Sequence, residues 1–173
     1  MTAYTVTIEI DDEPLHPRRD CEGNVGLFYT FNGLKYDVGD SSLSPDDMLA
    51  VVDLYKRGGI PYLPVYMIDH SSQSFSTVRR GDKWDESHIG YIFLNTRAFL
   101  DSIGGKIMSR KRNKLAYEYL KGEIQAIDDY HNTTYYYATI EDDEYYVIDS
   151  CSGFESEADA RQWAGDVLGA MDT

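Results

Sequence analysis

The stretch that decides this fold joins a basic helix start to a tyrosine-rich hairpin. Residues 109–150 read SRKRNKLAYEYLKGEIQAIDDYHNTTYYYATIEDDEYYVIDS. A long helix is predicted from Ser109, with a buried stripe at helical spacing made of Ala116, Leu120, Ile124 and Ile127. Beyond it, two tyrosine-rich segments flank the acidic run Glu141-Asp142-Asp143-Glu144, and this arrangement predicts a hairpin.

The pairing of that hairpin decides which tyrosines are exposed. If Ile140 faces Tyr145, the residues divide between two faces of the sheet. The face suited to a core holds Tyr136, Ala138, Ile140, Tyr145 and Val147. The other face presents Tyr135, Tyr137, Thr139, Tyr146 and Ile148 to solvent or to a partner. Eight of the fifteen tyrosines lie between Tyr117 and Tyr146, which favours an interface here.

Outward from this stretch, apolar runs predict further strands. They cover residues 4–10, 25–31, 34–38, 62–70, 74–78 and 89–94, and the last is the most hydrophobic and so a central strand. The dipeptide Asn32-Gly33 predicts a type I′ turn that joins 25–31 to 34–38 as a hairpin. Pro64 places its end of the 62–70 strand at an edge or a bulge.

Capping residues predict the helices. Ser44-Pro45 begins one that buries Met48, Leu49, Val52 and Tyr55 and stops at Gly58-Gly59. Asn95 or Thr96 caps a short helix, and Ser156 begins a last one. Strands next to strands, with helices between, predict an α+β fold with a mostly antiparallel sheet and helices packed on one face. We expect a single domain over residues 1–173, with 155–173 as an added C-terminal helix.

Length and composition limit the class of protein. With 173 residues, 42% of them hydrophobic, the chain can bury one sizeable core. No apolar run approaches the ~20 residues that cross a bilayer, and Met1 to Ile10 alternates unlike a signal peptide. Cys21 and Cys151 lie far apart in the sequence, which fits reduced thiols in a cytoplasm better than a disulfide framework. We therefore expect a soluble cytoplasmic protein.

The net charge of −14 is unevenly spread along the chain. Residues 1–53 contain 11 acidic and 3 basic side chains, residues 54–122 contain 6 and 12, and residues 123–173 contain 13 and 1. A basic middle is thus flanked by two acidic ends. An acidic field repels nucleic acid and anionic membranes and attracts basic protein surfaces built for phosphate, so the charge favours a protein partner.

Several short segments together resemble a known set of proteins. They are His70-Ser71-Ser72, Trp84-Asp85, Gly90-Tyr91-Ile92-Phe93, Lys121-Gly122-Glu123 and, most specifically, Asp149-Ser150-Cys151-Ser152-Gly153-Phe154. Over residues 4–154 the chain resembles an uncharacterised family of small acidic proteins carried by bacteriophages, plasmids and other mobile elements. Members usually have tryptophan where this chain has Ser152. The resemblance implies an accessory gene of a mobile element, for which countering host defence is a common role.

The basic helix start is the sharpest anomaly in the sequence. Arg110, Lys111, Arg112 and Lys114 lie at the positive end of the helix dipole, and Asp128 and Asp129 lie at its negative end. Such a start is suited to an anion held by side chains and free N–H groups. The alternatives are that the acidic ends of the same chain cover it, or that water solvates it.

The acidic ends suggest the opposite idea, that carboxylates imitate DNA phosphates on a host enzyme. The candidates are Glu141, Asp142, Asp143, Glu144, Asp128, Asp129, Glu155, Glu157 and Asp159, joined by the outward tyrosines Tyr135, Tyr137 and Tyr146. The alternative is that these acidic runs are solvated loops and helix faces. About half of the tyrosines would then be core residues or cross-strand pairs.

Catalytic patterns are weaker than these binding signals. Asp69, His70, Asp85 and His88 make a candidate metal set, and Cys151 with His70 or His88 a candidate nucleophile and base. Neither set has the residue spacing of a known metal-binding or catalytic motif. Trp84 fits a core anchor better than a platform for a ligand.

We therefore expect a non-enzymatic protein without cofactor or metal that inhibits a host factor, such as a nucleic-acid-handling defence complex. The inhibitor would be of the anti-CRISPR or anti-restriction type. The partner would be a host protein with a basic nucleic-acid-binding surface, with homodimerisation left open and no membrane partner. The alternatives are a nucleic-acid or nucleotide-binding regulator that uses residues 110–114, and a metal-dependent hydrolase.

Overall fold

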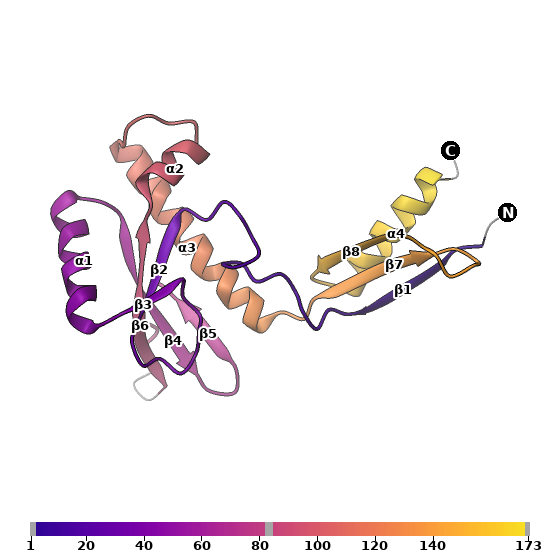
Figure 1. Ribbon diagram of the computed structural model, residues 1–173, viewed down its shortest axis with the longest axis horizontal. Helices are drawn as coiled ribbons and strands as arrows, with labels where there is room; N and C mark the ends of the chain where they lie inside the picture. Colours follow the sequence, from indigo (N-terminus) through magenta and orange to yellow (C-terminus); the bar gives the residue numbers. More distant parts are fainter. Residues whose placement is uncertain (1–2, 82–84, 172–173) are drawn as a thin grey trace. The chain divides into compact units, whose positions relative to one another are not determined.

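The computed structural model describes residues 3–81 and 85–171, so Trp84 lies outside the described residues. These residues form four helices and eight strands, and the prediction of an α+β fold with mostly antiparallel strands is confirmed (Figure 1). The strands make two sheets. The chain divides into a larger compact unit, His16–Asn132, and a smaller one formed by the described residues before and after it.

The larger unit contains a five-stranded sheet in the order β3-β2-β6-β4-β5. Its strands are β2 (Gly26–Phe31), β3 (Ser41–Leu43), β4 (Tyr62–Asp69), β5 (Gln73–Ser76) and β6 (Glu86–Leu94). The hydrophobic run 89–94 lies in the central strand, as predicted. The expectation for Pro64 is also confirmed, because β5 pairs with β4 only from Tyr66 onward and the β4–β6 register shifts between Val65 and Tyr66.

The helices of the larger unit cover both faces of this sheet. They are α1 (Pro45–Gly58), α2 (Thr96–Ser102) and α3 (Arg110–Asn132). Figure 1 shows α1 and α3 on opposite sides of the strands, which differs from the expected packing on one face. The reason is that both faces of the sheet carry large apolar side chains. The Phe93 ring contacts the Tyr55 ring of α1 in a tilted arrangement (4.8 Å between centroids), while Phe28 and Ile92 belong to the core under α3.

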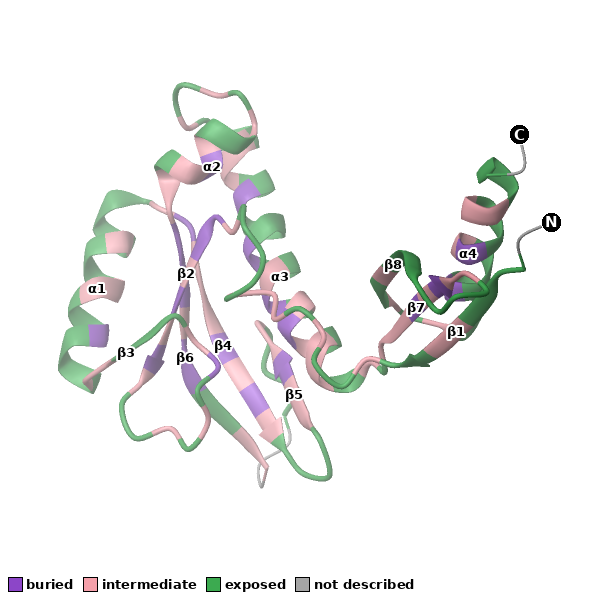
Figure 2. Cartoon of the chain, turned by 45° about the vertical axis from the view of Figure 1, so that its right-hand side comes forward, coloured by how far each residue is buried: buried purple, intermediate pink, exposed green. Residues whose placement is uncertain are grey.

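The predicted helix signals are confirmed at most positions. Ser44 Oγ accepts from the Asp47 N–H (3.1 Å), and Gly59 ends α1 with φ 62°. Asn95 caps α2. The stripe of α3 is buried as predicted, and Figure 2 shows buried residues along one side of that helix. Leu49 is an exception, because it is 60% exposed and Met48 alone of the α1 stripe is fully buried.

The predicted hairpin over 25–31 and 34–38 is wrong. Residues 34–38 form no strand, and β3 pairs with β2 in parallel instead. The cause is a long-range ion network. Arg18 donates to Asp40 (Nε to Oδ1, 2.9 Å), and Asp40 in turn accepts from the Phe28 N–H (2.8 Å), so the segment from Asp40 occupies the edge of β2.

The same arginine joins α3 to the sheet. It forms an ion pair with Glu123 and donates to the Gly26 carbonyl (2.7 Å), and its side chain is only 4% exposed. Glu123 also accepts from the N–H groups of Val25 (2.6 Å) and Gly26 (3.0 Å). A Cβ at Gly26 would lie 2.7 Å from Glu123, so glycine permits this approach. Burial alone would lower the pKa of Arg18, but Asp40 and Glu123 raise it.

Replacing Arg18 should destabilise the larger unit strongly. Arg18→Ala leaves Asp40 and Glu123 without their counter-charge, and breaking a buried pair costs on the order of 3–5 kcal/mol. Arg19→Ala is the matched control, because the Arg19–Asp37 pair is exposed (54% and 86%) and should cost less than about 1 kcal/mol. Amide hydrogen exchange in β6 measures both losses. Equal losses for the two variants would contradict the role of Arg18.

The smaller unit is a three-stranded antiparallel sheet covered by a helix. Its elements are β1 (Thr5–Ile10), β7 (Tyr136–Glu141), β8 (Val147–Phe154) and α4 (Glu157–Met171), with strand order β1-β7-β8. Ser156 caps α4 as predicted, because its Oγ accepts from the Asp159 N–H (3.1 Å). Ala138 and Ile140 of β7 and Ala160 and Ala164 of α4 are fully buried. Within the described residues, no helix has the length and apolarity to cross a bilayer.

The register of the β7–β8 hairpin differs from the prediction. Ile140 faces Asp149, not Tyr145, and Glu141 faces Val147 across a register shift. Residues 142–146 instead form the turn. Tyr145 was predicted on the core face and is 83% exposed, the most exposed large hydrophobic residue among those described. The predicted pairing leaves a four-residue turn, 141–144, whereas the turn has five residues, 142–146, and this difference changes which β8 residues face β7.

Candidate binding surfaces

An open groove of about 1160 Å³ lies beside the first half of α3. Its apolar lining comes from Leu63 of β4, from Ile103 after α2 and from Leu115 and Tyr117 of α3. Its cationic lining consists of Lys111, Arg112, Lys114 and Lys121, and Glu118 is the one carboxylate among the described residues that line it. We call this the basic groove. Lys111, Lys114, Glu118 and Lys121 recur every three or four residues, which places them along one side of the helix.

Most of the cations in the first half of α3 have no acidic partner in the described part of their own unit. Within the described part of the larger unit, no ion pair joins Arg110, Lys111, Arg112 or Lys114 to a carboxylate. Arg112 donates to the Ile107 carbonyl, and Lys121 pairs with Glu118 (2.8 Å). Ser109 supplies the N-terminal cap through the Arg112 N–H (3.3 Å). Three of the four predicted anion-binding residues, Lys111, Arg112 and Lys114, therefore line one groove, whereas Arg110 is not part of its lining.

The second surface is the turn of the β7–β8 hairpin together with the strand residues next to it, Glu141–Ile148, which we call the acidic tip. Asp142 organises it. Its Oδ1 accepts from the N–H groups of Glu144 and Tyr146 (2.9 Å each), and its backbone N–H donates to the Tyr146 carbonyl (3.1 Å). Asp143 and Glu144 are exposed, and so are Tyr146, Val147 and Ile148 at 65%, 58% and 42%. The tip combines negative charge with exposed apolar surface.

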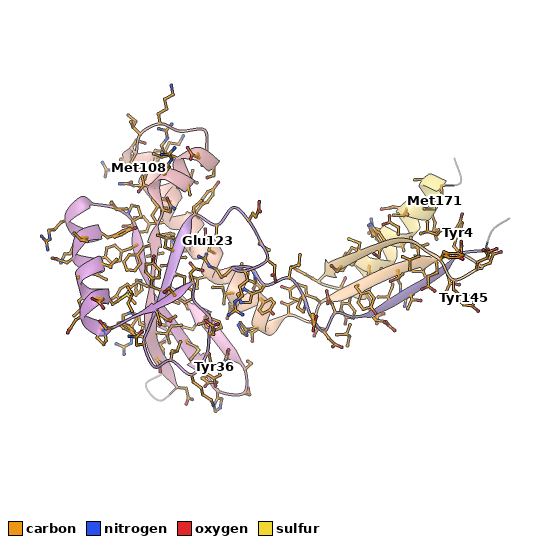
Figure 3. The ribbon with its side chains drawn as sticks, in the orientation of Figure 1. Tyr4, Tyr36, Met108, Glu123, Tyr145 and Met171 are labelled. Atoms are coloured by element: carbon orange, nitrogen blue, oxygen red, sulfur yellow. The ribbon has the colours of Figure 1, made fainter. Side chains whose placement is uncertain are left out.

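Tyr145 adopts an unusual backbone conformation at this tip. Its φ is 65°, the only positive value at a non-glycine residue among those described. The left-handed region costs a residue with a Cβ about 1–2 kcal/mol. Its N–H donates to the Asp142 carbonyl (3.1 Å), so the turn holds it there. Figure 3 shows the Tyr145 side chain at the end of the hairpin. A strained and exposed aromatic residue is a candidate for function.

Glycine at this position should stabilise the tip. Tyr145→Gly removes the left-handed strain and loses little buried area, so the β7–β8 hairpin should gain about 1 kcal/mol. Tyr146→Gly is the control, since its φ is not positive and the change should stabilise nothing. Hydrogen exchange at the Ala138 and Ile140 amides reports both. A loss of protection in Tyr145→Gly would show that the conformation carries no strain.

The other predicted partner-binding acids are distributed between the units. Asp128 and Asp129 belong to α3 in the larger unit, not to the tip. Asp128 accepts from the Phe75 N–H (2.6 Å) and the Ser74 hydroxyl (2.9 Å), so it fixes the start of β5. This contact explains an acid at the negative end of the helix dipole. Asp129 accepts from the Gln125 side chain (2.9 Å).

In the smaller unit, Glu157 pairs with Arg161 (3.5 Å) and Asp159 accepts from the Ser156 hydroxyl (2.7 Å), while Glu155 is exposed. Of the predicted tyrosines, Tyr146 alone is exposed. The Tyr135 carbonyl accepts from the Asp11 N–H (2.8 Å), and Tyr137 donates to Glu9 across the β1–β7 pair. That hydrogen bond to Glu9 raises the pKa of Tyr137.

The structure does not gather the predicted catalytic residues. Among the residues described, no group of three or more His, Cys, Asp or Glu side chains is placed to hold a metal ion. His70 lies 3.6 Å from Asp85, but Asp69 accepts from the Tyr36 hydroxyl (2.8 Å) and His88 contacts the Gly90 carbonyl (2.9 Å). Burial lowers the pKa of His88. Cys151 lies on β8 of the smaller unit, whereas both histidines belong to the larger one.

Sequence reasoning found the cations of the groove but missed its apolar wall. Leu63 and Ile103 join Leu115 only through tertiary packing, and each looked like an ordinary core residue in the sequence. Tyr145 was also missed, because alternation assigned it to the buried face. No protein-family model, curated protein or solved structure matches this chain. The residues and their geometry therefore carry the functional argument.

Proposed function

We propose that this protein is a non-enzymatic inhibitor that uses its acidic smaller unit to occupy a basic, nucleic-acid-binding surface of a host protein. The observation that carries the proposal is the division of charge between the units. Residues 1–15 and 133–173 contain 14 acidic side chains and one basic side chain, a net charge of −13. Residues 16–132 contain 16 and 15, a net charge of −1.

The negative charge of the smaller unit is available to a partner. In the part of it that the structure describes, a single ion pair forms, between Glu157 and Arg161. Asp11, Asp12 and Glu13 follow β1, and the acidic tip follows β7. Dense unpaired carboxylates repel nucleic acid and favour association with a cationic protein surface at short range. The charge thus favours a target with a cationic surface that itself binds phosphate.

The exposed tyrosine and apolar side chains of the tip add a contact that charge alone lacks. Tyrosine is enriched among residues that dominate binding energy, because it buries a large rigid ring at a small entropic cost. Tyr146 and Tyr145 stand beside Asp143 and Glu144 in the same turn. The resemblance to acidic proteins of mobile elements supports action against a nucleic-acid-handling defence complex in the cytoplasm of a host cell.

A tip-neutralised variant tests this proposal. Glu141→Gln, Asp143→Asn and Glu144→Gln together remove three charges but keep Asp142, which organises the turn. The wild-type chain should retain a nucleic-acid-binding protein from nuclease-treated host extract, with retention that falls as salt rises, and DNA should compete for that protein. The variant should bind it at least about tenfold more weakly.

The matched control removes three exposed charges from the larger unit. Glu22→Gln, Asp53→Asn and Asp101→Asn change the net charge equally and leave the tip intact. This control should bind the retained protein as the wild type does. If both variants weaken binding equally, binding depends on the net charge of the chain and not on the acidic tip. Retention that neither salt nor DNA affects would overturn the proposal.

A further inference from the structure

The basic groove needs an occupant that is both acidic and apolar. Leu115 is 41% exposed and Tyr117 36% exposed, so a considerable part of the lining is uncovered apolar surface. Lys111, Lys114 and Arg112 line the same groove and have no carboxylate partner among the described residues of their unit. Duplex nucleic acid would satisfy the cations but would leave the apolar wall exposed to water. A peptide segment with carboxylates beside an aromatic ring satisfies both.

The chain itself contains a segment of that composition. In the acidic tip, Asp143 and Glu144 directly precede Tyr145, and Val147 and Ile148 follow it within three residues. The hydrogen bonds of Asp142 hold the turn in one conformation before any partner binds. A preformed turn loses little conformational entropy on docking, so its exposed ring is suited to act as an anchor.

We propose that the acidic tip of one copy docks in the basic groove of a second copy of this chain. The Tyr145 ring contacts the apolar wall at Leu115 and Tyr117, and Asp143 and Glu144 face Lys111 and Lys114. Charge complementarity selects this occupant, since the smaller unit has a net charge of −13 and the rim of the groove is cationic. The strain at Tyr145 and its exposure are then explained as features of a contact residue.

The two surfaces differ, so the contact is heterologous. Each copy has one tip and one groove, and such contacts close into a reciprocal dimer or ring, or extend into a chain of copies. Either result increases the mass with protein concentration and weakens in high salt, because the contact includes exposed charges. This inference does not depend on the proposed function, although both use the tip. A host protein would compete with a second copy for it.

A charge-swap experiment on the full chain tests the contact. The groove variant is Lys111→Glu with Lys114→Glu, and the tip variant is Asp143→Lys with Glu144→Lys. Each should remain monomeric in sedimentation velocity, because it places like charges opposite one another. A mixture of the two restores opposite charge at both kinds of contact, and should associate into a mixed complex with a Kd within about tenfold of the wild type.

An uncharged variant checks the anchor. Tyr145→Ala should weaken self-association by about tenfold or more, while Tyr4→Ala, a partly exposed tyrosine of the same unit, should leave it unchanged. Circular dichroism and melting must match the wild type for every variant. A wild-type chain that stays monomeric at all concentrations, as docking within one copy would produce, overturns the proposal. So does association that the variants leave intact, or a mixture that fails to associate.

Discussion

The structure of the larger unit depends on one buried guanidinium. Arg18 connects the segment before β2, the carboxylate of Asp40 and the carboxylate of Glu123 on α3. Those carboxylates accept N–H groups at Val25, Gly26 and Phe28, so the charge of Arg18 also sets where β2 begins and what lies along its edge. A buried ion pair is tolerated when further hydrogen bonds satisfy its remaining oxygens, and this one meets that condition.

The sequence predicts those parts of the fold whose causes are local. Ser44, Asn95 and Ser156 cap helices where their side chains imply, and the stripe from Ala116 to Ile127 is buried because helical periodicity alone determines it. Asn32-Gly33 failed as a hairpin signal for a non-local reason. The Arg18–Asp40 pair holds the segment from Asp40 at the edge of β2, and the separation of these two residues in the sequence conceals the contact. The number of predicted strands does not show whether those strands form one sheet or two.

The candidate surfaces likewise combine features that the sequence predicts with features that depend on tertiary contacts. Charge is a sum over residues, so the cations of α3 and the acids of the smaller unit were visible in the sequence. Their neutralisation was not visible, because ion pairs depend on which side chains meet. Asp128 proved to fix β5, whereas Lys111 and Lys114 have no carboxylate partner in the described part of their unit. The apolar wall of the groove required Leu63 and Ile103 to meet α3, which only tertiary packing shows.

The order of the elements has a consequence for synthesis on the ribosome. β1 leaves the exit tunnel before the larger unit, yet its partner β7 follows the whole of that unit. Within that unit the rings of His16 and Tyr130 lie 4.9 Å apart, so once it folds, its two ends are held together. Folding of the larger unit thus shortens the loop that must close before β1 can pair with β7. The pairing of β1 with β7 therefore becomes entropically cheaper once the larger unit has folded.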